Sequence, residues 1–312
     1  MKTSSVPHCM MRLALVPVAA GWLAAGAFTS QAAIIADFSG GEGTSSPNQF
    51  KGMAGEGWLD GWNSRNGSNG TTTFTVESTA PLRTGAGNYL KIDYQRNDTG
   101  GSNRAGVARP FATTGPTGVD IAQPYTISFD FRIDELKGWD ASGDQIAFSS
   151  ENVTTIGSFA GTAPWALWLR ADKPGWQVRD GNGAGGGDFL DFAELGLDTI
   201  EVGAVYSVTV EMDPLVGRYD LTIRVGTKVY RASDLNGGDW LGFGGTTQEA
   251  KAFNVLQFRA TMNGEEDGIA WSMDNLRVAA VPEAGSMALG LGGLIGVFSL
   301  LKGRQCLQRR RL

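Results

Sequence analysis

The side chains that most often carry nucleophilic or redox chemistry are almost absent from this sequence. Its one histidine is His8, and its two cysteines, Cys9 and Cys306, lie near the opposite ends of the chain. Residues 33–280 therefore contain no histidine-based triad, no zinc or copper site with histidine or cysteine ligands, and no disulfide. The chemistry that remains is that of carboxylates, of tyrosine or lysine bases, and of calcium bound through oxygen.

Paired carboxylates are the first of these options. Glu211 and Asp213 alternate along one face of an expected strand, where two carboxyl groups can converge. Retaining glycoside hydrolysis needs such groups about 5–5.5 Å apart. The simpler interpretation, which we prefer, is that both residues are solvated on the polar face of the strand.

Exposed tryptophans are the second option, because sugars stack on indole rings. Trp139, Trp176 and Trp240 stand beside Asp and Gly at expected loops or strand edges. We predict that these three form a stacking platform for a glycan. The alternative is that each simply anchors its loop.

A glycine-rich loop offers oxygen ligands for a hard cation. Asp180, Asn182 and Asp188 lie within it, and calcium prefers such ligands on a backbone that can bend. The sequence therefore predicts a possible calcium site, although the spacing is not that of an EF-hand. A flexible loop without metal is the alternative.

The elements that must position these residues are strands. Short segments of alternating polarity are separated by Gly, Asn, Asp and Pro, and no long amphipathic helix is evident. In residues 124–134 and in residues 206–213, the apolar residues share one face of the expected strand. We expect residues 218–225 to form a hairpin with residues 206–213. In residues 254–263 we expect Gln257, Arg259 and Thr261 to face water. The pattern predicts a single all-β domain of eleven to thirteen strands with antiparallel sheets.

The last expected strand, residues 268–280, changes phase. Trp271 and Met273 have one parity and Leu276 has the other, which predicts a β-bulge near Asp274 and Asn275. We expect this strand to bring residues 271–278 close to residues 34–39, so that the two ends of the domain meet.

Residues 1–32 have the form of a secretory signal. Lys2 and Arg12 precede an apolar run, and Ser30 and Ala32 occupy the −3 and −1 positions of a small-residue cleavage site. We therefore predict that the protein is exported and that its signal helix is removed after Ala32.

Residues 281–312 form a second terminal signal. The motif at 281–286 is followed by an uncharged span, 287–301, and a basic tail, 302–312. A helix of fifteen residues is about 22 Å long, short of a ~30 Å hydrocarbon core, and basic flanks stay in the cytoplasm. We predict a short transmembrane helix that serves as a temporary stop.

This tail resembles the PEP-CTERM class of sorting signals in its Val281, Pro282 and Glu283, its apolar span and its arginines 309–311. One departure is Ala284, where the family has a second proline. The resemblance implies processing by an exosortase, a membrane protease, after a transient stage in the inner membrane. It implies an exported protein at the cell surface or in the extracellular matrix of a Gram-negative-type bacterium.

The strand pattern and its closing Asp274-Asn275 resemble concanavalin A-like, or laminin-G-like, jelly-roll sandwiches. Laminarinase-type glucanases of that class carry a third carboxylate after the pair that Glu211 and Asp213 match. Leu215 and Val216 stand at that place here, so we predict no catalytic residue.

Charge narrows the choice of partner. Without Glu283 and the seven basic residues of the two terminal signals, residues 33–280 carry a net charge of −12. Such a surface disfavours nucleic acid and anionic lipid. We therefore expect a non-catalytic module that binds extracellular polysaccharide. A carboxylate glycosidase and a structural matrix protein without a ligand are the two alternatives.

Overall fold

The structure is a computed structural model, and it describes the residues given at the end of this paragraph. They belong to one compact unit, Gln31–Leu312. The signal segment, most of the sorting motif, the span 287–301 and the basic tail lie outside them. Within the described part of the chain, no helix is both long and apolar enough to cross a membrane. The described residues are 33–36, 38, 44–46, 49–50, 56–65, 70–83, 87–96, 103–139, 143–156, 161–173, 175–263 and 268–281.

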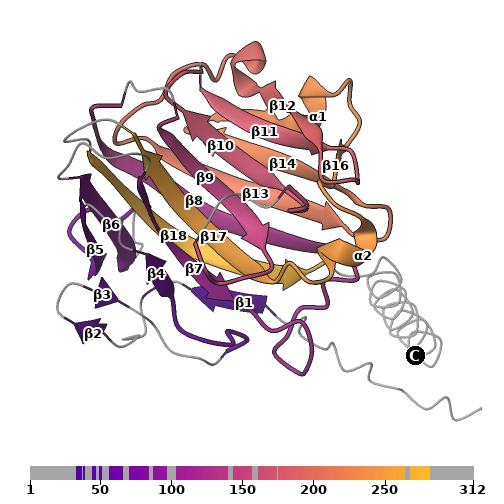
Figure 1. Cartoon of the computed structure of the whole chain (residues 1–312), viewed down its shortest axis with the longest axis horizontal. Coiled ribbons are helices and arrows are strands. Elements are labelled where there is room, and N and C mark those ends of the chain that lie inside the picture. Colours follow the sequence, from indigo (N-terminus) through magenta and orange to yellow (C-terminus); the bar gives the residue numbers. More distant parts are fainter. Residues whose placement is uncertain are drawn as a thin grey trace, which may run out of the picture. The chain divides into compact units, whose positions relative to one another are not determined.

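Two β-sheets make up this unit, which confirms the prediction of an all-β sandwich with antiparallel sheets (Figure 1). The larger sheet has eleven strands in the order β15-β14-β13-β8-β18-β6-β5-β3-β2, with β1 beside β18 and β16 beside β14. Only β3 and β5, among its described pairs, run parallel. Its strands are β1 (Ala33–Ala36), β2 (Thr44–Ser46), β3 (Gln49–Phe50), β5 (Gly70–Glu77), β6 (Tyr89–Arg96), β8 (Tyr125–Lys137), β13 (Val205–Asp213), β14 (Arg218–Val225), β15 (Lys228–Arg231), β16 (Leu241–Gly242) and β18 (Gly268–Ala280).

The smaller sheet has seven strands in the order β12-β11-β10-β9-β17-β7-β4. Three short helical turns, η1 (Phe192–Leu195), α1 (Ala232–Leu235) and α2 (Thr247–Ala250), complete the described elements. The eighteen strands exceed the predicted number because several have only two to four residues. The strands of this sheet are β4 (Asn63–Arg65), β7 (Asn103–Pro110), β9 (Gln145–Glu151), β10 (Ala166–Arg170), β11 (Trp176–Gly181), β12 (Gly187–Asp191) and β17 (Val255–Met262).

The core lies between the two sheets and is rich in aromatic rings. Phe131 of β8 meets Phe148 of β9 at 4.7 Å between ring centroids, and Phe129 of β8 meets Phe258 of β17 at 5.1 Å. These rings come from the apolar faces that the alternation predicts. Edge-to-face pairs of this kind add about 0.5–1.5 kcal/mol each to the burial of their surface.

The first and last strands of the domain pair with each other, as predicted. Ala33 to Ala36 of β1 pair with Ala279 to Leu276 of β18. The hairpin of β13 and β14 also forms, over eight residue pairs. The register of β18 against β8 shifts after Asp274, and Asn275 there has a φ of 52°, so the predicted bulge is confirmed as well.

Strand β17 departs from the prediction. All eight of its residues are buried, including Gln257, Arg259 and Thr261, which we expected to face water. Alternation does place these three side chains away from the core. The expectation was wrong because the segment 152–156 reaches over this face, where Gln257 Nε2 donates to the carbonyl oxygens of Val153 and Thr155 at 2.9 and 3.2 Å.

Candidate ligand-binding face

The face of the smaller sheet that points away from the core carries a band of buried polar side chains. Strands β9, β11 and β17 supply it, and β10 lies between β11 and β9. Each of its residues is only 2–4% exposed, although polar side chains on an outer face normally stay in water. We call this set the polar lane. Its members are Ser149, Glu151, Gln177, Arg179, Gln257 and Arg259.

Strand register fixes the layout of the lane. In one row Gln177 pairs with Trp168, Trp168 with Ala147, and Ala147 with Arg259. Since neighbouring strands lie about 4.8 Å apart, Gln177 and Arg259 are separated by three spacings, or about 14 Å.

In the next row Ala166 pairs with Ser149, and Ser149 pairs with Gln257. The first row thus has the large ring of Trp168 beside Ala147, whereas small residues stand next to Gln257 in the second.

Several lane residues are held by hydrogen bonds. Ser149 Oγ donates to Glu151 Oε1 at 2.9 Å, Arg179 Nη2 donates to the carbonyl oxygen of Gly186 at 2.8 Å, and Gln177 Nε2 donates to Asp191. These contacts fix the side chains before any ligand arrives, which lowers the entropy cost of binding.

Two amide oxygens of the lane remain without a donor. Among the described residues, Oε1 of Gln177 and Oε1 of Gln257 are buried and accept no hydrogen bond, and Arg104 Nε, in the next row on β7, donates none. An unsatisfied buried polar atom costs about 1–3 kcal/mol. Buried polar atoms normally have a hydrogen-bond partner. A hydroxyl group can donate to the amide oxygens and can accept from the arginine N–H.

The arginines of the lane are charged at neutral pH. Burial lowers the pKa of Arg259 to about 10, against the opposing effect of Glu151, and Arg104 lowers it further. Burial also lowers the pKa of Arg179, which Tyr219 and Glu151 partly restore. Glu151 thus supplies a negative charge between two positive ones, and the lane has no strong excess of either sign.

Trp168 and Phe189 form an aromatic pair at the β12 side of the lane. Their ring centroids are 4.3 Å apart, and both side chains are partly exposed. Sequence reasoning did not select Trp168 as a candidate, although its parity is opposite to that of Trp165, which is buried and 1% exposed. That difference in parity was the signal that could have selected it.

The three predicted tryptophans do not form one platform. Trp139 is partly buried against the core just beyond the end of β8, and Trp240 lies under Arg218 with 5.4 Å between guanidinium carbon and ring. Arg218 pairs with Asp213, beside the opposite end of β8, and that strand of thirteen residues is about 40 Å long. Trp139 and Trp240 are therefore far apart.

Trp176 is a core residue, so its prediction as a stacking residue was wrong. It is 0% exposed and makes edge-to-face contacts with Phe131 and Tyr206 at 5.9 and 5.4 Å. Trp176 was expected at a loop or strand edge with its ring exposed; it is the first residue of β11, and its ring points into the core. Alternation then turns its ring inward and turns Gln177 outward.

The predicted calcium residues belong to a hairpin whose oxygens have other partners. Asp180 and Asp188 face each other across β11 and β12. Asn182 Oδ1 accepts the N–H groups of Ala184 and Gly186, both at 3.0 Å, and Asp180 Oδ1 accepts that of Gly242 at 2.8 Å. These oxygens point at N–H donors, which does not fit a cation.

Among the described residues, no group of three or more His, Cys, Asp or Glu side chains could hold a metal ion. The loop that joins β11 to β12 is thus shaped by Asn182 and its backbone contacts.

The paired carboxylates lie on the other sheet. Asp213 Oδ2 is 3.5 Å from Arg218 Nε at the end of the β13–β14 hairpin. Glu211 faces Asp220, whose oxygens accept from the backbone of Leu221 and from Ser233. Both carboxylates are therefore remote from the polar lane.

Of the sorting motif, only Val281 is described. Its N–H donates to the carbonyl oxygen of Pro124 at 3.0 Å, and its side chain is 41% exposed. Pro282 and Glu283 lie outside the described residues.

Comparison with known proteins identifies no family for this chain. No family profile and no curated protein matches it. Among solved structures it is similar to the catalytic domain of a glycoside hydrolase family 131 protein from Coprinopsis cinerea, with 10% identity, a TM-score of 0.43, and coverage of 71% of this chain and 84% of the other.

Two further structures show similarity of the same size. One is a family 131 β-glucanase catalytic domain from Podospora anserina, at 10% identity, TM-score 0.42 and coverage of 70% and 86%. The other is lectin I from Ulex europaeus in complex with the methyl glycoside of α-L-fucose. Its identity is 8%, its TM-score is 0.39, and the match covers 70% of this chain and 98% of the lectin. At these values the matches assign no activity to this chain, and function has to be inferred from its own side chains.

Proposed function

We propose that this protein is a non-catalytic module that binds a polysaccharide across the polar lane. The observation that carries the proposal is the pair of buried amide oxygens, on Gln177 and Gln257, that lack donors among the described residues. The partly exposed rings of Trp168 and Phe189 lie beside Gln177, whereas a ligand reaches the oxygen of Gln257 only when the segment 152–156 above it moves.

A sugar suits this combination of groups. Its hydroxyls can donate to the amide oxygens and accept from arginine, while its C–H face packs on an aromatic ring. Ligand sites typically combine an apolar surface with a few fixed polar groups in this way.

The carboxylate of the lane, Glu151, and the carboxylate beside it, Asp191, favour binding over hydrolysis. Glu151 lies on β9 and Asp191 on β12, and these strands are three spacings apart, or about 14 Å. The two carboxyl groups of a glycosidase are at most about 9.5 Å apart. Each also accepts a hydrogen bond, Glu151 from Ser149 and Asp191 from Gln177.

The binding specificity can be tested with the full-length protein on a glycan array, with and without calcium. The proposal expects selective binding that does not require calcium. Hydrolysis of a bound β-glucan, abolished by Glu211→Gln, would instead establish the glycosidase alternative. Absence of binding to any glycan would favour the structural matrix role.

We also propose that the protein is exported and sorted through its PEP-CTERM-like tail, with an exosortase as its processing partner. The arrangement of the two terminal signals supports this. Intact-mass analysis of the surface fraction should find a chain that begins near Ala33 and lacks Arg309 to Arg311. Retention of these arginines in the mature protein would contradict sorting and indicate a plain membrane anchor.

A further inference from the structure

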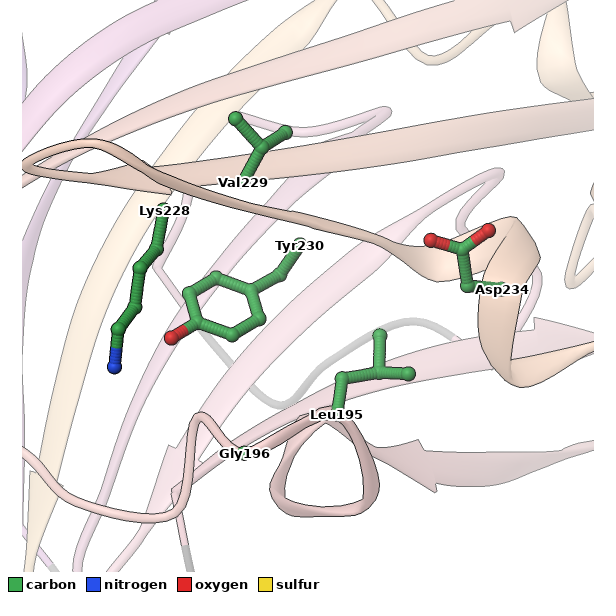
Figure 2. A pocket seen from close by; sticks show the side chains of 6 residues that line it. All are labelled: Leu195, Gly196, Lys228, Val229, Tyr230 and Asp234. Atoms are coloured by element: carbon green, nitrogen blue, oxygen red, sulfur yellow. The ribbon is translucent and has the colours of Figure 1, made fainter.

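A pocket lies at the edge of the larger sheet, apart from the polar lane. It is formed between η1, the edge strand β15 and α1, and its volume is about 450 Å³, which is in the range of small-molecule sites. Figure 2 shows the six residues that line it: Leu195, Gly196, Lys228, Val229, Tyr230 and Asp234.

Tyr230 is the central residue of this pocket. Its side chain is only 7% exposed, yet its hydroxyl forms no hydrogen bond with any of the described residues. The hydroxyl oxygen is not one of the buried atoms that lack a partner, so it is accessible to solvent. Here the pocket is the direction from which a partner can come.

Charged groups of opposite sign stand at the two ends of the ring. Figure 2 shows Lys228 on the side of the Tyr230 hydroxyl, whereas Asp234 lies toward the other end, above Leu195. Both charged side chains are exposed, and neither forms an ion pair within the described part of the chain. The pocket thus offers donors at one end, a carboxylate acceptor at the other, and apolar surface between them.

We propose that this pocket binds a carboxylated sugar unit, a hexuronate. Its carboxylate would accept from the ammonium of Lys228 and the hydroxyl of Tyr230, and its hydroxyls would donate to Asp234. The C–H face of its ring would pack against Leu195. A neutral hexose lacks the group that the Lys228 end recognises.

The inference rests on the proposed function only in taking a sugar as the ligand. The two sites differ in chemistry, because unpartnered amide oxygens in the lane suit neutral hydroxyls, whereas the Lys228 end of the pocket suits an anion. A molecule with both could hold two glycan chains and cross-link them in a matrix.

Tyrosine-labelled NMR spectra of the full-length protein test the pocket directly. The chain has six tyrosines, and the other five are at most 2% exposed: Tyr89, Tyr94, Tyr125, Tyr206 and Tyr219. Glucuronic acid should shift the Tyr230 signal alone and saturably, with the signal assigned through Tyr230→Phe. Glucose, which lacks the carboxylate, should bind at least tenfold more weakly.

Two lysine substitutions separate recognition of the carboxylate by Lys228 from a general effect of positive charge. Lys228→Met should remove the preference for glucuronic acid over glucose, whereas Lys251→Met, at an exposed lysine elsewhere, should keep it. An unmoved Tyr230 signal, an equal response to acetate, or an unchanged preference in Lys228→Met would each overturn the inference. A Tyr230 shift that persists when the lane binds nothing would contradict only the proposed function.

Discussion

At the scale of single residues, burial separates the tryptophans that can meet a ligand from those that cannot. Trp168 is partly exposed beside Gln177, whereas Trp176, only eight positions later, is a core residue. Both lie in the smaller sheet, and because Trp168 pairs with Gln177, the alternation along β11 puts the ring of Trp176 on the opposite face. The same alternation turns the unpartnered oxygen of Gln177 toward the lane.

Replacement of Trp176 should therefore affect stability rather than binding alone. Trp176→Ala leaves a cavity among Phe131, Phe148 and Tyr206, and large-to-small changes of this kind cost about 3–5 kcal/mol. Urea denaturation followed by fluorescence measures the loss. Trp240→Ala, at a half-buried position, is the control and should cost much less. A Trp176→Ala protein as stable as the wild type would show that this ring is not part of the core.

At the scale of elements, the bulge in β18 depends on one residue in a left-handed conformation. Asn275 has a φ of 52°, and its Nδ2 donates at 2.8 Å to Asp130, which is completely buried. Asparagine tolerates this region of φ better than most residues. Its side chain thereby joins β18 to β8 at the point where their register shifts.

Two substitutions at Asn275 should separate conformation from hydrogen bonding. Asn275→Gly keeps the left-handed backbone but loses a bond to a charged group, at a cost of about 1.5–3 kcal/mol. Asn275→Ala loses the same bond and adds about 1 kcal/mol of backbone strain. Thermal and urea unfolding of both variants should rank Ala below Gly and Gly below wild type. Equal stability of the two variants would mean that the φ value is not held in solution.

Elements with strong alternation could be predicted from the sequence, and others could not. The bulge followed from the phase change between Trp271 and Leu276, and the hairpin followed from residues 206–225. The cover over β17 could not be predicted, because it depends on contacts of Gln257 with residues about a hundred positions away in the chain. The lane was consequently missed, and two of its residues, Gln257 and Arg259, were expected to face water.

At the scale of the whole molecule, tyrosines are buried in the packing of the two sheets. Burial is the main reason why the pKa values of Tyr125, Tyr206 and Tyr219 lie above the ordinary value of 10. The folded state therefore keeps these protons at a pH where the unfolded chain releases them. The stability that they contribute is complete below pH 10 and is lost as the pH rises above it.

We thus predict a steep loss of stability in alkali. Each tyrosine contributes a slope of up to about 1.4 kcal/mol per pH unit. Arg259 opposes this, because its folded pKa of about 10 is below the ordinary 12.5 and its burial penalty is relieved in that range. A net loss on the order of 1–3 kcal/mol per unit should appear in urea unfolding between pH 9 and 11.5, values chosen to bracket the pKa of free tyrosine. If tyrosinate absorbance rises at a pH well below the pH of unfolding, the tyrosines ionise in the folded state, and the prediction is contradicted.

The central claim, that the polar lane binds a glycan, is tested most directly by the affinity of one pair of variants for the glycan that the array selects. Gln177→Met removes an unpartnered amide oxygen, together with the hydrogen bond to Asp191, with little change in size, whereas Thr209→Val alters the outer face of the other sheet. Calorimetry should show binding at least tenfold weaker for Gln177→Met, equivalent to ~1.4 kcal/mol, and unchanged for Thr209→Val, with both folded by near-UV circular dichroism. Wild-type affinity in a folded Gln177→Met protein, together with lost affinity in Thr209→Val, would place the site on the other sheet and contradict the account.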